Sequence, residues 1–256
     1  MEKMKLIRDT WLIFQRYLVI FIHNPVWVIV GLSQPILYLL LFAPILKGVA
    51  NSPGFPQGGA YNVFVPGLLI QLGLFGASGV GFGLIAELRE GVIERFRVTP
   101  VSRFALLLGR ALRDVLVLVV QATILLIIAI PFGLHATFSG AVVMLSLVAL
   151  IGLGISSIAY SVALALRSED SYAPLIFTVI LPLLLLSGVL LPLTLAPKWL
   201  QTLAYFNPLS YAVKAARDVF NGHGGDADVF IGLTVMLALA VIGVVIGARA
   251  FKKAAM

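Results

Sequence analysis

Apolar residues in this chain occur in long, almost uninterrupted runs rather than in short alternating segments. A helix of roughly 20 apolar residues crosses a hydrocarbon core of about 30 Å. A strand of a membrane barrel would instead show about ten residues of alternating polarity. The pattern therefore predicts an all-α, polytopic membrane protein with six transmembrane helices. The expected spans are Pro25–Leu46, Val63–Ile85, Ala111–Pro131, Ala141–Leu166, Ala173–Leu191 and Val229–Ala248.

Three other segments break the apolar pattern. Residues 1–24 place Lys5, Arg8 and Arg16 at near-helical spacing among large apolar side chains, which predicts an amphipathic helix at the membrane interface. Residues 86–103 carry the densest charge and predict a short amphipathic helix outside the membrane. Residues 190–228 contain proline-bounded apolar pieces too short to span, which predicts short re-entrant outer helices. We treat residues 1–256 as a single transmembrane domain.

Composition agrees with a membrane protein. Of the 256 residues, 61% are hydrophobic and only 11% are charged, whereas soluble domains carry about a quarter charged residues. The chain has no cysteine, which excludes disulfides, thiolate metal sites and cysteine nucleophiles.

The distribution of basic residues predicts the orientation. Six spans place both termini on one side, and most of the 18 lysines and arginines fall in the connectors of that side. By the positive-inside rule, both termini are expected in the cytoplasm, and the chain is expected to be a multi-pass protein of the plasma membrane. The net charge of +7 is therefore a signal of topology, and we expect no nucleic-acid partner.

The sequence lacks the residue patterns that nucleotide binding, metal binding and intramembrane catalysis require. There is no G-x-x-x-x-G-K-[ST] loop to bind a nucleotide phosphate, and the histidines His23, His135 and His223 fall in three separate connectors. No carboxylate is near the middle of an expected span, which argues against an intramembrane enzyme and against an ion-coupled transporter. We expect no catalytic site, metal or cofactor on this chain. A channel or a membrane scaffold stays an alternative.

Two local patterns predict contacts at the helices. Arg110 and Asp114 are the deepest charges, one helical turn apart, and are expected to form an interfacial charge pair at the start of the third span. Gly79-x-x-x-Gly83 and Gly243-x-x-x-Gly247 fit the small-residue spacing that allows close helix packing.

Residues 87–96 would have two faces if they formed one helix. The apolar edge would consist of Leu88, Val92, Ile93 and Phe96, and the acidic stripe of Glu87, Glu90 and Glu94. The helix is expected to end at Thr99–Pro100, because the residue before a proline avoids helical conformation. Such a helix suits docking to a soluble partner, with apolar residues in a groove and charges setting the register. The alternative is a solvated turn resting on lipid headgroups.

Two motifs carry a family resemblance. The string from Arg89 to Arg103, R-E-G-V-I-E-R-F-R-V-T-P-V-S-R, resembles the cytoplasmic signature of ABC type-2 transporter permeases, particularly the daunorubicin-type drug-resistance exporters. A second block, L-S-G-V-L-L-P ending at Pro192 followed by F-N-P-L-S-Y ending at Tyr211, resembles the end of that family's fifth span and its next motif. The pair Val92-Ile93 departs from the Thr-Leu of many relatives, on or beside the apolar edge.

The resemblance implies a permease subunit that works with a second permease copy and with separate ATP-binding-cassette subunits, which would hold ATP and Mg. The exported substrate would be drug-like or lipid-like, with a polysaccharide or glycolipid as the alternative. The residues that the resemblance implies in ATPase coupling are Glu87, Arg89, Glu90, Gly91, Glu94, Arg95, Arg97, Thr99, Pro100 and Arg103.

The second motif block implies an outer gate. Its residues are Pro192, Asn207, Pro208, Ser210 and Tyr211. Asn207 is expected to cap a helix that Pro208 starts, with Lys214 and Arg217 directed to outer headgroups or solvent. A structural plug and a gate that contacts substrate are equally compatible with these residues.

Overall fold

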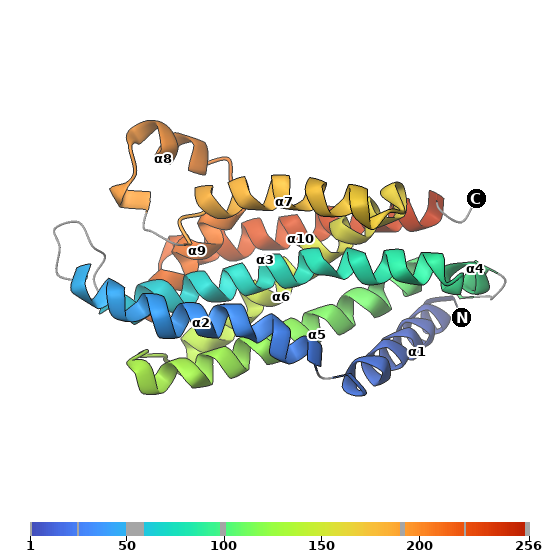
Figure 1. Ribbon diagram of the computed structural model, residues 1–256, viewed down its shortest axis with the longest axis horizontal. Helices are drawn as coiled ribbons and strands as arrows, with labels where there is room; N and C mark the ends of the chain where they lie inside the picture. The colour runs from blue at the N-terminus through green and yellow to red at the C-terminus, as the bar shows by residue number, and fades with distance from the viewer. Residues whose placement is uncertain are drawn as a thin grey trace.

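The computed structural model describes residues 2–24, 26–49, 59–97, 101–189, 193–222 and 224–253. Within these ranges the chain is helical, with the elements in the order α1 to α10 and two short 3-10 helices (Figure 1). The helices are α1 Glu2–Ile22, α2 Val26–Val49, α3 Gly59–Arg89, α4 Val92–Arg97, α5 Arg103–Ala129, η1 Ile130–Phe132, α6 Phe138–Leu166, α7 Glu169–Leu186, η2 Leu193–Leu195, α8 Lys198–Ala204, α9 Pro208–Phe220 and α10 Ala227–Lys253. The all-helical prediction is confirmed.

Five helices of the described chain are long and apolar enough to cross a membrane: α3, α5, α6, α7 and α10. They correspond to the second to sixth expected spans. The first expected span corresponds to α2, Val26–Val49, of which Val28–Leu41 is the continuous apolar part whose side chains are described. The polytopic membrane fold is therefore supported, and a crossing of the membrane by α2 stays a prediction.

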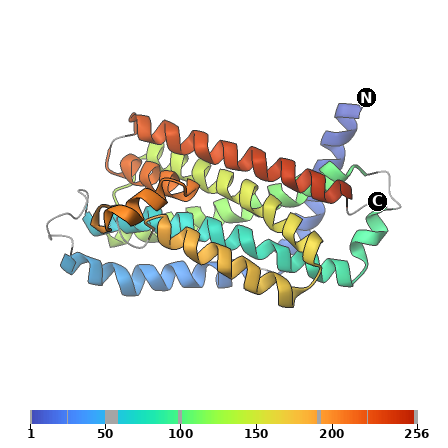
Figure 2. The same cartoon turned by 90° about the horizontal axis from the view of Figure 1, so that it is seen from above.

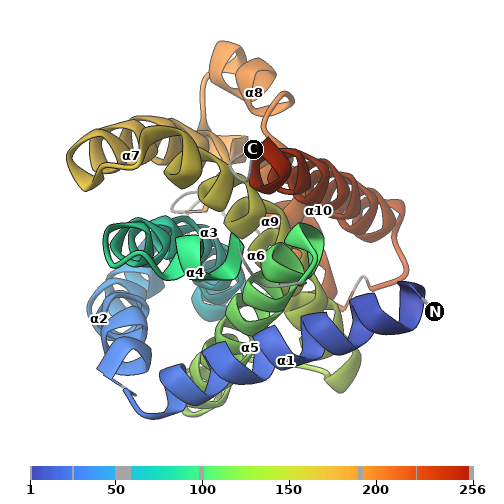
Figure 3. The same ribbon diagram turned by 90° about the vertical axis from the view of Figure 1, so that its right-hand side faces the viewer.

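The long helices run side by side, and the first turn of α1 and the last turn of α10 lie at the same end of the bundle (Figure 1). We call this end the terminal end. The short helices α8 and α9 lie at the opposite end. Seen along the bundle, α6 is central, α2, α3 and α7 lie on one side, and α10 lies on the other (Figures 2 and 3).

Side chains in the connectors cap the starts of α5 and α6. Ser102 and Thr137 each accept a hydrogen bond from a backbone amide in the first turn of α5 and α6, at 3.1 Å in both cases. These are N-cap contacts, which satisfy amides that have no partner within the helix. The α6 helix ends at Arg167, which adopts a left-handed conformation with φ 55°.

Small residues bring α6 and α10 together. A Cβ atom added to Gly243 would collide with the backbone carbonyl of Gly154, and one added to Gly247 would lie 3.1 Å from the carbonyl of Ser157. The close packing predicted at Gly243-x-x-x-Gly247 is therefore confirmed. The prediction at Gly79-x-x-x-Gly83 is wrong for the described chain, because a Cβ atom at either glycine would meet nothing within 4 Å.

The N-terminal helix crosses the terminal end obliquely and lies against α5 (Figure 3). Ile13 and Tyr17 are buried, while Trp11 and Leu12 on other faces are more than half exposed. A Cβ atom at Gly109 of α5 would lie 2.9 Å from the backbone carbonyl of Thr10, so only a glycine allows the two helices to approach this closely. The sequence pattern located this amphipathic helix correctly.

Candidate functional site

The charged segment that follows α3 is not one helix. The α3 helix continues to Arg89, a turn follows at Glu90 and Gly91, and α4 begins at Val92. Gly91 has φ 70°, a left-handed conformation that glycine adopts without steric cost. The expectation of a continuous helix is therefore wrong, and Glu87 is separated from the rest of the predicted acidic stripe by this turn.

The apolar edge of α4 packs against its own chain. Ile93 and Phe96 are buried in a cluster that includes Ile13 of α1 and Leu106 of α5. The guanidinium carbon of Arg16 lies 5.0 Å from the centre of the Phe96 ring. The prediction that these apolar residues seat in a partner's groove is therefore wrong, because α1, α3 and α5 already cover them.

The charged face of α4 is available for a partner. Glu94 and Arg95 are exposed, as are Arg89 and Glu90 just before α4. Arg89 pairs at 3.1 Å with Glu169 in the first turn of α7, an exposed contact. Of the other predicted coupling residues, Arg103 starts α5 and donates from Nη1 to the Phe96 carbonyl at 3.3 Å. Thr99, Pro100 and the side chain of Arg97 lie outside the described residues.

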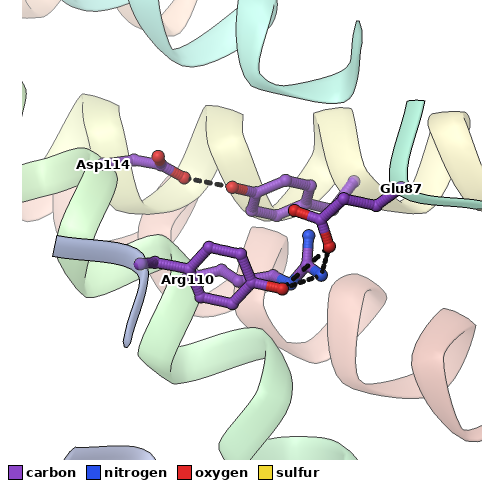
Figure 4. Close-up of polar contacts among 5 residues, drawn as sticks. Glu87, Arg110 and Asp114 are labelled. Atoms are coloured by element: carbon purple, nitrogen blue, oxygen red, sulfur yellow. Dashed lines mark hydrogen bonds and ion pairs between the residues drawn. The ribbon is translucent and has the colours of Figure 1, made fainter. Parts of the chain in front are cut away.

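Beneath this surface lies a buried polar cluster, which we call the Glu87–Arg110 cluster. Arg110 of α5, only 2% exposed, donates from Nη2 to the carboxylate of Glu87 on α3 and to the hydroxyl oxygen of Tyr17 on α1 (Figure 4). The Tyr17 hydroxyl donates to Glu87 at 2.8 Å. Burial raises the pKa of Tyr17, which keeps its hydroxyl protonated as a donor. The cluster comprises Tyr17, Glu87, Arg110, Arg113, Asp114 and Tyr160.

Asp114 occupies the other side of this cluster. It accepts a hydrogen bond from the hydroxyl of Tyr160 on α6, and Arg113 Nη1 lies 3.1 Å from its Oδ1 atom. The expected ion pair between Arg110 and Asp114 is therefore wrong. The two residues share a helix face, but α3, α1 and α6 supply closer partners that a pattern within one helix cannot reveal.

The cluster joins four helices at the terminal end, next to the charged residues around α4. It connects α1, α3, α5 and α6, and Glu87 lies in the last turn of α3 immediately before the turn to α4. Glu87 and Arg110 therefore connect the end of α3 nearest α4 with α5. Sequence reasoning missed Tyr17 as a partner. Its signal was a hydroxyl on the buried face of an amphipathic helix, where a polar group needs a partner.

At the opposite end, the predicted gate residues bind the local backbone. Asn207 Oδ1 accepts from the amide of Leu209 at 3.0 Å, which confirms the predicted cap of α9, and Asn207 Nδ2 donates to the carbonyl of Leu183 on α7 at 2.6 Å. Ser210 Oγ donates to the Ala204 carbonyl at 2.8 Å. Pro208 is the first residue of α9, and Tyr211 donates to the Tyr205 carbonyl at 3.0 Å. Pro192 lies outside the described residues.

Arg217 points into the bundle, not towards solvent as expected. Its Nε atom donates to the carbonyl of Val63 on α3 at 2.9 Å, and its Nη2 atom donates to the carbonyl of Gly188, just after α7, at 2.8 Å. Lys214 agrees with the expectation, since its side chain is 61% exposed and pairs with Asp228 at 2.9 Å. The fork of donors on Arg217 therefore joins α3, α7 and α9.

The described residues contain no group of three or more His, Cys, Asp or Glu side chains placed to hold a metal ion. The polar chemistry of the terminal end is instead that of ion pairs and hydrogen bonds between helices. Such contacts position helices and resist their separation, because breaking a buried pair leaves an uncompensated charge.

Comparison with known proteins gives consistent matches. The chain is 26% identical over 217 residues to the transport permease ycf38 of Cyanophora paradoxa, covering 84% of this chain and 75% of that one. It is 26% identical over 229 residues to the daunorubicin resistance ABC transporter permease of Streptomyces coeruleorubidus, covering 89% and 80%. It is 27% identical over 159 residues to the multidrug ABC transporter permease YbhR of Escherichia coli K12, covering 61% and 43%.

The family comparison covers most of the chain. Residues 8–221 match the ABC-2 type transporter family, a range that includes α4 and the Glu87–Arg110 cluster. Members of this family are membrane subunits of ABC transporters that work with ATP-binding subunits and are not themselves the ATPase. The chain belongs to the ABC-2 type transporter family.

Proposed function

We propose that this chain is the permease subunit of an ATP-driven exporter that moves an amphipathic or hydrophobic substrate, drug-like or lipid-like, across the plasma membrane. Separate ATP-binding subunits, which carry ATP and Mg, supply the energy. The observation that carries the proposal is the exposed charged face of α4 directly beside the buried Glu87–Arg110 cluster.

The coupling surface consists of Arg89, Glu90, Glu94 and Arg95. It carries both charge signs, which fix the register of a partner more than they add affinity. The apolar side of α4 packs against α1 and α5. The α4 helix is therefore already folded and in place before a partner docks. When the ATP-binding subunits close, they displace α4. The contact between Glu87 and Arg110 then transmits this displacement to α3 and α5.

Orientation and assembly follow from the same surface. The coupling surface lies at the terminal end, so both termini are cytoplasmic, in agreement with the excess of basic residues there. The second permease copy docks on the side where α2, α3 and α7 lie. Large apolar side chains are exposed there, including Leu37 and Leu41 of α2 and Phe177 and Leu181 of α7.

The substrate class rests on the relatives. Two of them bear the words daunorubicin resistance and multidrug in their names. The described spans carry few polar side chains and no exposed aromatic track, which supports a drug-like or lipid-like substrate over a polysaccharide or glycolipid. A channel would require a ring of charges or a filter of carbonyl groups, and the described bundle contains neither.

Site-specific photo-cross-linking tests the docking surface. A photoreactive phenylalanine replaces Glu94 in the full chain, expressed in its native cells, and cross-linked products are identified by mass spectrometry. The same residue at Trp199 of α8, exposed at the opposite end, is the control. We expect position 94 to capture a soluble chain with a phosphate-binding loop, and position 199 not to capture it.

Capture at position 199 and not at 94 would contradict the proposed orientation. Capture at neither position, with both proteins inserted and folded, would contradict the docking surface and favour a channel or a scaffold.

A further inference from the structure

An apolar groove runs between α1 and α5 near the terminal end. Its volume is about 570 Å³, within the range of about 300–1,000 Å³ that is common for ligand cavities. Thr10 supplies the one hydroxyl among the lining side chains. The other lining residues include Leu6, Ile7 and Trp11 of α1 and Leu108, Leu112 and Leu116 of α5.

The groove opens sideways from the bundle. Leu112 and Leu116 are 42% and 38% exposed, and they lie on the face of α5, a helix long and apolar enough to span a membrane. The α1 helix crosses over this face and covers its terminal-end side (Figure 3). Water cannot satisfy its hydrogen bonds in so apolar a space, and an empty groove would forfeit dispersion contacts. An acyl chain from a surrounding bilayer would supply those contacts.

The charges beside the groove indicate which lipid. Arg8 directly follows the lining residue Ile7, and its side chain is 73% exposed. Lys5 directly precedes Leu6 and is also exposed. The one acidic side chain described in α1, Asp9, is buried, and its Oδ1 atom lies 4.0 Å from Arg8 Nε, so one carboxylate stands against the two basic side chains. A headgroup at this rim therefore meets positive charge, which is complementary to an anionic phosphate ester.

We propose that the α1–α5 groove binds one acyl chain of an anionic phospholipid from the leaflet at the terminal end, with Lys5 and Arg8 facing its headgroup. The bound lipid fills the groove beside the direct contact of α1 with α5 at Gly109. It thereby stabilises the helix that carries Tyr17 to the Glu87–Arg110 cluster. The inference requires membrane insertion but no ATP-binding partner.

Fluorescence quenching by brominated lipids tests the site. The chain has three tryptophans, so Trp27→Phe and Trp199→Phe leave Trp11, which lines the groove, as the single reporter. The full chain is reconstituted in phosphatidylcholine vesicles, where bromine is placed on the acyl chains of either phosphatidylglycerol or phosphatidylcholine. We expect half-maximal quenching at an about 25-fold lower fraction of the brominated phosphatidylglycerol, because two basic side chains each contribute about fivefold.

Two sets of variants test the contacts, three at charged residues and two on α5. Arg8→Gln and Lys5→Gln should each reduce the preference for phosphatidylglycerol by about fivefold at low salt, the effect of about one basic side chain near an anionic surface. Lys252→Gln, exposed at the end of α10, should leave it unchanged. Leu116→Phe, which fills the groove, should weaken quenching by both lipids, whereas Ile127→Phe on the exposed far part of α5 should not.

Three results would overturn the proposal. Equal quenching by the two lipids would mean that Trp11 meets only bulk bilayer. Loss of the preference on adding inorganic phosphate alone would mean a free-anion site. Absence of quenching together with disulfide formation between Leu112→Cys copies would mean that a second copy covers the groove. Each result leaves the proposed transport function unaffected.

Discussion

Glu87 near the end of α3 and Arg110 in α5, 23 positions apart in the sequence, form an ion pair. Arg110 is fully enclosed, and Glu87 lies one turn before the connection to α4. The pair thus connects the surface proposed to receive the ATP-binding subunits with two helices of the bundle. This relationship gives the predicted coupling region a structural route into the membrane domain.

Removing the buried charge should be costly. Arg110→Met leaves Glu87 and the Tyr17 hydroxyl without their shared partner, so we expect a loss of about 3–5 kcal/mol of stability. Thermal unfolding of the detergent-purified chain measures it. Arg89→Met is the matched control, because it breaks the exposed Arg89–Glu169 pair and should cost about 0–1 kcal/mol. Equal destabilisation by the two variants would refute the buried role of Arg110.

Substitutions on the buried face of α4 should lower stability, whereas substitutions on its exposed face should lower coupling to ATP hydrolysis. Phe96→Ala removes a buried ring, so we expect a loss of about 3–5 kcal/mol of stability. Glu94→Lys changes an exposed residue and should alter stability by no more than about 0.5 kcal/mol. It should nevertheless lower substrate-stimulated ATP hydrolysis by the complex. A Glu94→Lys protein that is as unstable as Phe96→Ala would contradict this division.

The sequence predicted what local patterns can encode. The lengths of the apolar runs located the five helices long enough to span, the amphipathic spacing located α1, and Asn207–Pro208 located the start of α9. Each of these signals lies within a few neighbouring residues. Glu94 and Arg95 of α4 are exposed, as the amphipathic pattern predicted.

Contacts between distant segments could not be predicted in the same way. Arg110 was expected to pair with Asp114 because one helix places them on one face, but the fold brings Glu87 closer. Arg217 was expected to reach outward, yet it donates inward to the carbonyls of Val63 and Gly188. The amphipathic spacing predicted one continuous helix, but a left-handed turn at Gly91 divides it into two.

The α6–α10 contact should not tolerate a methyl group. Gly243→Ala places a Cβ atom against the Gly154 carbonyl, so the helices must separate at a cost of about 1–3 kcal/mol. Gly79→Ala adds the same group on α3 where nothing lies within 4 Å, and should not destabilise the chain. The comparison is made by thermal unfolding of both purified variants. If Gly243→Ala unfolds no earlier than Gly79→Ala, this packing is incorrect.

Arg217 should hold the outer segment in place. Arg217→Met removes the hydrogen bonds to the Val63 and Gly188 carbonyls, so we expect a loss of about 1–3 kcal/mol of stability. Hydrogen exchange at the amides of Ser187 to Val189 should rise, because their connection to α9 is lost. Lys214→Met removes only the exposed pair with Asp228 and should leave that exchange rate unchanged. Equal exchange in both variants would contradict the role of Arg217.

The orientation can be read from single cysteines, since the chain has none of its own. Lys198→Cys in α8 should react with a membrane-impermeant maleimide added to intact cells. Glu94→Cys in α4 should react only after permeabilisation. Both positions are exposed, so a difference in labelling reflects the side of the membrane and not burial. The reverse labelling pattern would invert the proposed topology.

The central claim is that the charged surface of α4 transmits ATP-driven closure to the bundle. The most direct measurement is ATP hydrolysis by the complex purified with this chain in mild detergent, comparing the unaltered chain with the Glu90→Lys, Glu94→Lys double variant. We predict that the unaltered chain recovers an ATP-hydrolysing partner and that the double variant, equally well inserted and folded, loses most of that activity. Full ATP hydrolysis and transport by the double variant would contradict the claim.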